Sequence, residues 1–414
     1  MSFKTATVAA ALIAATGLAQ AQAADAADPV ATLVKHLELE KYKATIKGLT
    51  QFGDRRQGTA RNRAALDWIE AQLKSYGCTN TERLQYQFTE PAKRTPAAPR
   101  GPLAGGPAGQ GGSTLFGKRA PIGVNTDPLA QPDERLRKLD AEPTPEGTSL
   151  RENVYCTKIG TTRPDEMYIV GAHMDGIGWG EAANDNGSGT ALVMELARIF
   201  SLPGVTTERS IRFVLWNNEE TGLNGAYAYV EQRKGLQGIE SPKGSGLYPE
   251  PKWLGMIQHD MMMFDHGMPV PKLDAAGKPV LDAKGQPVYA PPKEQRAEAD
   301  VNIEYQSTSK HADGAAKLAW HFRAANDKYA TNYPAAVGFH MTNTDSTPFM
   351  DEVPAISLRE NERGQQIGAG WNPHWHQPTD LFVNYSDKDF LLGLNAAQTT
   401  LAAVAQLTGV KVKP

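Results

Sequence analysis

The pattern of apolar and polar positions is most informative between residues 167 and 200. Met167–Val170 is a short run of apolar, partly β-branched residues, which predicts a buried strand. Residues 171–186 are rich in glycine, aspartate and asparagine, which predicts a turn. Thr190–Phe200 carries apolar residues spaced as on one face of a helix. We therefore expect this segment to form a strand-loop-helix unit of a parallel sheet.

The same two patterns recur along the rest of the chain. The predicted strands are Glu82–Phe88, Asn153–Lys158, Ser210–Trp216, Leu254–Ile257 and Pro354–Leu358. The predicted helices are Pro29–Tyr42, Ala60–Tyr76, Ser309–Tyr329 and Lys388–Leu407. Because strands alternate with helices, we predict an α/β fold of three layers, α/β/α, with a mostly parallel central sheet and helices on both faces.

Two stretches rich in proline and glycine interrupt this pattern, at about residues 90–150 and 266–307. Sequences of this kind bury little apolar surface. Both are interpreted as inserts in a single domain that spans residues 24–414. The second insert follows Asp260 directly, so it could overhang a site at that position.

Residues 1–23 have the composition of a secretory signal peptide. Lys4 precedes an apolar run, Ala6–Leu18, and Ala21–Ala23 has the small residues of a cleavage site. The run is too short to span a bilayer and no later apolar stretch is long enough, so we expect no membrane span. The mature protein, beginning near Ala24, is predicted to be periplasmic or secreted.

Charge and cysteine content restrict partners and compartment. The 414 residues carry a net charge of -3, so there is no basic excess of the kind that binds nucleic acid. The two cysteines, Cys78 and Cys156, could form a disulfide if the strands predicted at 82–88 and 153–158 are neighbours. The oligomeric state is left open by the sequence.

Histidine and carboxylate side chains follow the predicted strands one after another. This group consists of His173, Asp175, Asp185, Glu219, Glu220, Asp260 and His376. Side chains just past the carboxyl ends of strands lie where open α/β sheets build their sites. Two imidazoles together with several carboxylates are donors suited to zinc. The sequence therefore predicts a metal site at this edge of the sheet.

In this order, the residues resemble the motifs of peptidase family M28, metallopeptidases with two zinc ions. The matching motifs are His173–Met174–Asp175, Ala183–Gly189, Glu219–Glu220, Asp260–Met261, and His376 four residues before Asp380. The resemblance begins near Leu49 and excludes the two inserts, so residues 24–414 are expected to be an M28-like peptidase domain. One position departs from the family, because Ser346 stands where a histidine is often found. Any role of that histidine in the family is therefore not expected in this chain, whereas the set of metal ligands is unaffected.

The resemblance implies a division of the metal ligands. Asp185 would bridge two zinc ions, His173 and Asp260 would complete the site of one, and Glu220 and His376 that of the other. The charges agree with this division, because three carboxylates and a bridging hydroxide neutralise two Zn²⁺ ions.

The resemblance also implies the catalytic roles. Glu219 is the expected general base, and Asp175 is expected to accept the second N–H of the His173 imidazole and so orient the ring. Ser188 is expected to cap the following helix. The implied activity is that of a metalloexopeptidase, an aminopeptidase that hydrolyses the N-terminal bond of a peptide substrate.

Three alternatives stay open at this point. A metallocarboxypeptidase of the same fold would need a cation such as Arg359 or Arg363 to bind the terminal carboxylate of its substrate. A glutaminyl cyclase of similar fold works with one zinc, and the complete ligand set argues against it. A non-catalytic secreted protein that binds metal structurally is disfavoured by Glu219 beside that ligand set. The sequence does not indicate a side-chain preference.

Overall fold

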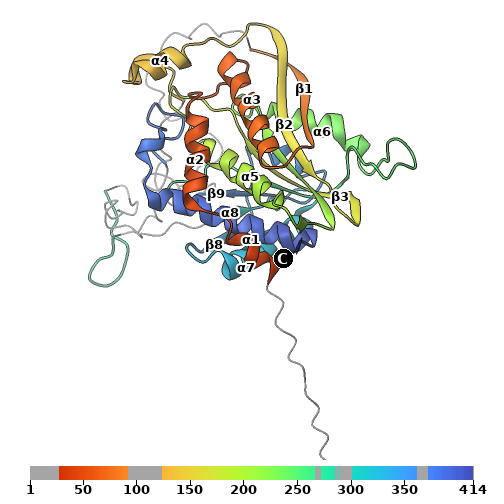
Figure 1. Ribbon diagram of the computed structural model, residues 1–414. Coiled ribbons are helices and arrows are strands. Elements are labelled where there is room, and N and C mark those ends of the chain that lie inside the picture. The colour runs from red at the N-terminus through yellow and green to blue at the C-terminus, as the bar shows by residue number, and fades with distance from the viewer. Residues whose placement is uncertain are drawn as a thin grey trace, which may run out of the picture.

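The computed structural model of the chain describes residues 28–91, 124–265, 272–283, 285, 288, 301–360 and 372–413. The predicted signal peptide, Arg363 and much of both predicted inserts lie outside the described residues. Figure 1 shows the described helices and strands as ribbons.

The described strands form one large sheet and one small one. The large sheet has eight strands in the order β1-β2-β5-β3-β6-β9-β7-β8. These strands are β1 (Thr81–Thr89), β2 (Thr148–Lys158), β5 (Arg209–Trp216), β3 (Arg163–His173), β6 (Lys252–His259), β9 (Ala355–Arg359), β7 (Val301–Glu304) and β8 (Ala335–Gly338). The small sheet pairs β4 (Val205–Thr206) with β10 (Lys411–Val412).

The centre of the large sheet is parallel. Strands β5, β3, β6 and β9 all run in the same direction. The antiparallel pairs lie toward the edges, where β2 joins β1 and β5 on one side and β7 joins β9 on the other. The prediction of a mostly parallel central sheet is confirmed.

Helices cover both faces of this sheet. The α-helices are α1 (Pro29–Val34), α2 (Leu39–Thr50), α3 (Ala60–Ser75), α4 (Glu134–Asp140), α5 (Gly187–Phe200), α6 (Asn224–Arg233), α7 (Ala312–Tyr329) and α8 (Asp387–Thr408). The short 3₁₀ helices are η2 (Pro128–Ala130), η3 (Lys234–Leu236), η5 (Thr347–Phe349) and η7 (Phe382–Asn384).

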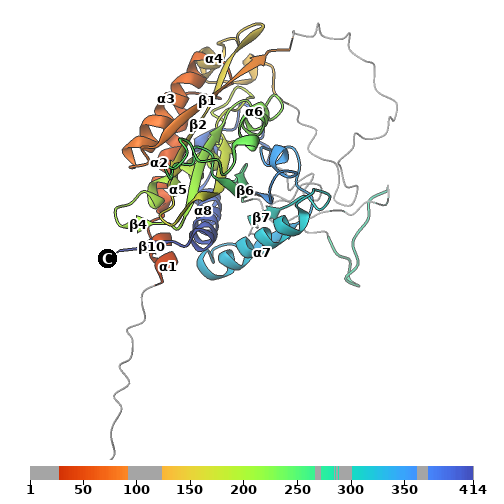
Figure 2. The same ribbon diagram turned by 90° about the vertical axis from the view of Figure 1, so that its right-hand side faces the viewer.

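The two faces of the sheet have separate apolar cores. On one face, residues of α1, α2, α3, α5, α7 and α8 share a single hydrophobic cluster with the strands. On the other face, α6 and η5 pack over a cluster rich in aromatic rings, which includes Trp216, Tyr229, Trp253 and Phe349. Figures 1 and 2 show α5 and α8 on one side of the sheet and α6 on the other. These are the three predicted layers.

Several predicted boundaries differ from the structure. The helix predicted at Pro29–Tyr42 is two helices, α1 and α2. The second predicted insert extends too far, because its last residues form β7, a strand inside the sheet. The end of the first predicted insert likewise contains α4 and the start of β2.

The two cysteines of the chain form a disulfide. Cys78 and Cys156 are joined in a disulfide with a Cα–Cα distance of 6.0 Å. The strands predicted beside them are indeed neighbours, as β1 and β2.

Among the described helices, α8 has the length and apolar composition to cross a bilayer. It is mostly buried, however, and packs against α7, α5 and α1, as the core helix of a globular domain does.

Candidate metal centre

The register of the parallel strands brings the candidate ligands together. β3 ends at His173, which pairs with Trp216, the last residue of β5. On the other side of β3, Ala172 pairs with His259, the last residue of β6, so Asp260 follows at the same level. The loops that leave β3, β5 and β6 therefore begin side by side, at the carboxyl edge of the sheet.

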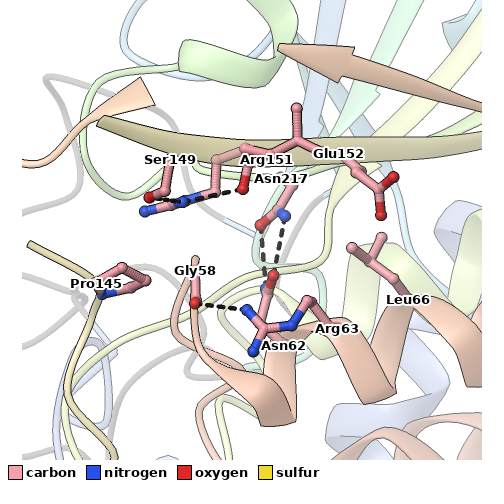
Figure 3. A pocket seen from close by; sticks show the side chains of 10 residues that line it. Gly58, Asn62, Arg63, Leu66, Pro145, Ser149, Arg151, Glu152 and Asn217 are labelled. Carbon is pink, nitrogen blue, oxygen red and sulfur yellow. Dashed lines mark hydrogen bonds between the residues drawn. The ribbon is translucent and has the colours of Figure 1, made fainter. Parts of the chain in front are cut away.

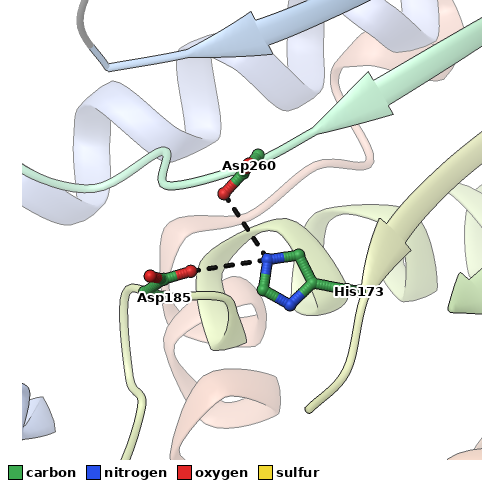
Figure 4. A group of neighbouring side chains, drawn as sticks. All are labelled: His173, Asp185 and Asp260. Atoms are coloured by element: carbon green, nitrogen blue, oxygen red, sulfur yellow. Dashed lines mark ion pairs between the residues drawn. The ribbon is translucent and has the colours of Figure 1, made fainter. Parts of the chain in front are cut away.

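The first ligand group lies around the ring of His173. Its Nε2 is 3.4 Å from Oδ1 of Asp185 and 3.5 Å from Oδ1 of Asp260. Figure 4 shows both carboxylates directed at this one nitrogen. All three side chains are buried.

The second group lies around the ring of His376. Its Nε2 is 3.0 Å from Oδ2 of Asp185 and 2.9 Å from Oε2 of Glu220. The ring of Trp375 stacks on the imidazole, with centroids 4.0 Å apart. Asp185 thus belongs to both groups, with one oxygen in each.

The donor chemistry of these residues fits metal ions. In each group the ligand atoms lie within 4.8 Å of one another, and a third such group is formed by His173, Glu219 and Glu220. Among the described residues, Oε1 of Glu220 and Nδ1 of His376 are buried without a hydrogen-bond partner. Carboxylates that are buried and face one another need a cation between them. The five predicted metal ligands are arranged in this way, and the arrangement is suited to divalent ions.

The pKa shifts show the shortage of positive charge at this centre. Burial raises the pKa of Glu219 well above its ordinary value, and the neighbouring Glu220 and Asp345 add to the effect. Burial also raises the pKa of Glu220, to about 7. Burial opposes the charged form of His376, yet the carboxylates of Glu220 and Asp185 raise its pKa to about 11. The buried carboxylates of this centre therefore have too little positive charge beside them to be ionised together.

The position of Asp175 differs from the expected one. Nδ1 of His173 lies 3.0 Å from the backbone carbonyl oxygen of Asp175, whereas the carboxylate is 3.8 Å away. That carboxylate instead accepts the backbone N–H groups of Glu219, at 3.1 Å, and Glu220, at 3.4 Å. The main chain of Asp175 orients the ring, and its side chain holds the loop that carries the two glutamates.

The loop of Asp185 is held by Asp380, a residue for which the sequence suggested no role. The Asp380 carboxylate accepts the backbone N–H groups of Asn184 and Asp185 at 2.9 and 3.0 Å, and the hydroxyl of Tyr385 at 2.8 Å. Burial raises the pKa of Asp380 to about 6. In the sequence, the feature that points to Asp380 is its position four residues after His376. The peptide between Asp185 and Asn186 is cis.

The helix after Asp185 is capped by Asn186 and not by Ser188, as was expected. Oδ1 of Asn186 accepts the N–H of Gly189 at 2.9 Å. A Cβ at Gly189 would lie 2.4 Å from that oxygen, so a glycine is needed there. The hydroxyl of Ser188 donates to the carbonyl of Asn184 and accepts the N–H of Met262, which joins the Asp185 loop to the residues after Asp260.

Arg359, a candidate cation for a substrate carboxylate in the sequence analysis, instead contacts a proposed metal ligand. It is the last residue of β9. Because Leu358 pairs with His259 of β6, Arg359 lies beside Asp260. Its side chain is buried, and Nη2 donates to Oδ2 of Asp260 at 2.5 Å.

The segment around Ser346 lies near the centre, because the charge of Asp345 acts on Glu219. Asp345 is buried, and its Oδ2 accepts a hydrogen bond from Nε2 of Gln258 at 2.9 Å. Burial raises the pKa of the Asp345 carboxyl well above its ordinary value. Oγ of Ser346 is buried and makes no hydrogen bond to a described residue.

Left-handed backbone conformations gather at this centre. In the described part of the chain, the non-glycine residues with positive φ are Arg55, Trp179, Ala182, Asn218, Leu223, Met261, Asn343 and His376. Four of them, Leu223, Met261, Asn343 and His376, line a cavity that also contains the candidate ligands. Two others are close in sequence to these ligands, because Asn218 precedes Glu219 and Ala182 lies in the loop between His173 and Asp185. Such conformations are uncommon outside glycine and cluster at functional sites.

Two cavities lie near these residues. The first, of about 150 Å³, contains the candidate ligands together with the apolar side chains of Leu223, Met261 and Trp375. The second, of about 290 Å³, lies between α3 and β2 and is lined by Arg63 and Arg151 among others (Figure 3). Asn217 forms part of its wall, two residues before Glu219.

A model of peptidase family M28 matches residues 153–401. The chain belongs to this family. The matched range contains all seven candidate site residues, from His173 to His376.

Relatives and solved structures extend this likeness. The probable lipoprotein aminopeptidase LpqL of Mycobacterium tuberculosis is 36% identical over 249 residues, 59% of this chain and 43% of that protein. The aminopeptidase YwaD of Bacillus subtilis is 43% identical over 68 residues, 16% of this chain and 14% of that protein. In these alignments the chain spans less than half the length of either relative.

Solved structures share the fold at low sequence identity. An aminopeptidase from Aneurinibacillus sp. strain AM-1 has a TM-score of 0.56 and 19% identity, over 91% of this chain and 95% of that chain. A zinc aminopeptidase from Bacillus subtilis has a TM-score of 0.56 and 16% identity, over 91% and 97%. A glutaminyl cyclase from Porphyromonas gingivalis also has this fold, with a TM-score of 0.51 and 17% identity over 90% and 99%. The fold alone therefore does not choose between these activities.

Proposed function

We propose that this M28 family member is a zinc-dependent aminopeptidase that holds two zinc ions. The observation that carries the proposal is the orientation of Asp185, whose Oδ1 lies 3.4 Å from Nε2 of His173 and whose Oδ2 lies 3.0 Å from Nε2 of His376. One ion would be held by His173, Asp185 and Asp260, and the other by Asp185, Glu220 and His376. Metal analysis of protein purified without chelator should find two zinc ions per chain.

The residues around these ligands can perform peptide hydrolysis. Zinc ions bound here would polarise the carbonyl of a peptide and lower the pKa of a water molecule. Glu219 is in a ligand group with His173 and Glu220, but it contributes to neither of the two groups that contain Asp185. We assign it the role of general base: it takes a proton from the attacking water and delivers it to the departing amine.

Two observations favour attack at the N-terminus of the substrate. The relatives LpqL and YwaD are named aminopeptidases. A carboxypeptidase needs a cation for the substrate's terminal carboxylate, and Arg359, the described candidate, is buried and bound to Asp260. Arg363, the other candidate, lies outside the described residues.

One peptide tests the direction of cleavage when it is offered in three forms: free, N-acetylated and C-amidated. Acetylation should stop cleavage because it removes the free amine, and amidation should leave the rate nearly unchanged. If amidation alone stops cleavage, the enzyme recognises the other terminus and is a carboxypeptidase.

The same preparation separates the remaining alternatives. A glutaminyl cyclase would convert an N-terminal glutamine into a ring without cleaving a peptide bond, and the two complete ligand groups favour hydrolysis over that reaction. A protein that binds zinc and changes neither substrate would be a metal-binding protein without catalytic function. Glu219 beside the ligands argues for catalysis.

We also propose that the protein is exported. Lys4, the apolar run Ala6–Leu18 and the small residues before Ala24 have the order of a signal peptide, although they lie outside the described residues. The disulfide between Cys78 and Cys156 is consistent with an oxidising compartment. N-terminal sequencing of the native protein should find a chain that begins near Ala24, and a cytoplasmic chain that retains Met1 would contradict export.

A further inference from the structure

The side chain of Arg55 makes an unusual set of contacts. It is completely buried, and its guanidinium donates hydrogen bonds to four backbone carbonyls. Nε donates to the carbonyl of Met174 at 2.8 Å, and Nη2 donates to that of Ala182 at 2.8 Å. Nη1 donates to the carbonyls of Glu181 at 2.8 Å and Gly53 at 3.1 Å. Three of the four acceptors belong to one loop.

That loop connects two of the proposed metal ligands. Met174 directly follows His173, and Ala182 lies three residues before Asp185. The carbonyl of Ala182 also accepts the N–H of Gly187, the first residue of α5, at 3.0 Å. Arg55 therefore fixes the loop at the exit from β3 and again at the entry to α5.

The main chain of Arg55 is anchored as firmly as its side chain. Nδ2 of Asn62, on α3, donates to the carbonyl of Arg55 at 2.7 Å. Asn62 and Asn217 exchange amide hydrogen bonds of 3.1 and 3.0 Å, which Figure 3 shows. Since Asn217 lies two residues before Glu219, the same arrangement joins the loops after β3 and β5.

The charge of Arg55 is not explained by an ion pair. Burial lowers the pKa of its guanidinium, and carboxylates such as Asp380 and Asp54 oppose this effect through charge alone. Its hydrogen-bond acceptors are neutral carbonyls. A buried charge without a direct partner is costly to stability, whereas a planar fork of N–H donors is the group that can hold several carbonyls at once.

We propose that Arg55 is a positioning residue, which sets the spacing of His173 and Asp185 by clamping the loop between them. This inference rests on the proposed function, in which both residues bind zinc. It gives the loop between α2 and α3 a part in the metal centre, although this loop lies upstream of the residues that match the family model, 153–401.

The test is the variant Arg55→Lys. Lysine keeps the charge but cannot reach carbonyls on both sides of the loop, because its donors lie on a single nitrogen. We expect zinc affinity, measured by competition with a chelator, to fall roughly tenfold or more, as it does when residues that orient ligands are lost. In the metal-free protein, hydrogen exchange at the amides of residues 174–186 should become faster.

Two controls separate positioning from general destabilisation. Leu73→Ala removes a fully buried side chain from α3, eleven residues from Asn62, or about 16 Å along the helix. It should lower the midpoint of urea unfolding, because it leaves a cavity in the core, without changing zinc affinity or exchange in the loop. Arg56→Lys alters the neighbouring arginine, whose described hydrogen bonds are made by its main chain, and should change neither measurement.

The outcomes distinguish this inference from the proposed function. If Arg55→Lys loses stability as Leu73→Ala does but keeps wild-type zinc affinity and loop exchange, Arg55 is a structural residue and the inference is wrong. If the wild type itself binds no zinc, the proposed function fails. The exchange comparison in metal-free protein then still decides whether Arg55 clamps the loop.

Discussion

Arg359 donates a hydrogen bond from Nη2 to Oδ2 of Asp260 over 2.5 Å, in a position where both side chains are buried. The other oxygen of Asp260 faces His173. Burial alone would raise the pKa of Asp260, but the charge of Arg359 and the contact with His173 hold it well below its ordinary value. The arginine thus keeps a proposed metal ligand ionised and fixes its rotation.

Arg359→Met should therefore weaken zinc binding. The loss of a group that orients a ligand typically costs 10- to 100-fold in metal affinity, and we expect a decrease of about that size. Arg359→Lys retains the charge without the planar fork and should show a smaller decrease. Chelator competition measures both, and an unchanged affinity in the methionine variant would show that Asp260 needs no such partner.

The two adjacent glutamates should respond differently to the same substitution. Glu219→Gln should lower kcat by about 10²-fold or more, since it removes the proton acceptor, while zinc stays bound. Glu220→Gln should lose zinc affinity, because Oε2 of Glu220 faces His376 at 2.9 Å in the second ligand group. Metal content and kcat are measured for both variants, and the reverse pattern would exchange the two roles.

Stability should depend on pH through Asp140. Its side chain is buried beside Asp54 and Arg61, and burial together with the charge of Asp54 raises its pKa from 3.8 to about 8. Between these values the folded protein holds a proton that the unfolded chain releases. The contribution of Asp140 to stability is therefore present below pH 4 and is lost as the pH rises toward 8.

Asp140→Asn removes this titration and keeps the shape of the side chain. The wild type should lose up to about 1.4 kcal/mol of unfolding free energy per pH unit more than the variant across this window. Urea unfolding of both proteins at several pH values measures the difference. Parallel curves would show that Asp140 is ionised in the folded protein.

The disulfide should make a large contribution to stability. It joins Cys78 to Cys156 across a separation of 78 residues. Closing a loop of this length lowers the entropy of the unfolded chain and is worth about 4.5 kcal/mol. The double variant Cys78→Ala/Cys156→Ala should lose about this amount in urea unfolding. A reducing agent should lower the stability of the wild type toward that of the variant, and should leave the variant unchanged.

The elements with strong periodicity were predicted well from the sequence, and the short ones were not. β3, β5 and β6 are apolar runs that end at or shortly before the candidate ligands, so both the strands and the site could be placed. β7 has only four residues and follows a proline-rich stretch, which hid it inside a predicted insert. β8, also of four residues, was missed because so short a run has no readable period.

Within the site, the prediction identified which residues gather but not which atoms meet. The order of histidines and carboxylates located five proposed ligands, because the carboxyl ends of parallel strands share one edge. The spacing of His173 and Asp175 could not show that the backbone carbonyl of Asp175, and not its carboxylate, faces the ring. For the same reason the sequence did not indicate the role of Arg55, and it offered Arg359 only as a cation for a substrate and not as the partner of Asp260. Both contacts depend on register and on the direction of a side chain.

The proposed centre draws on residues from Arg55 near the first helices to His376 just before the last one. No shorter stretch of the chain contains the clamp, the bridging aspartate and both histidines together. A chain that has folded only as far as the residues before His376 therefore lacks one of the two proposed ligand groups. The proposed centre can assemble only after the loops that follow β3, β5 and β6 and the loop before α8 have packed together.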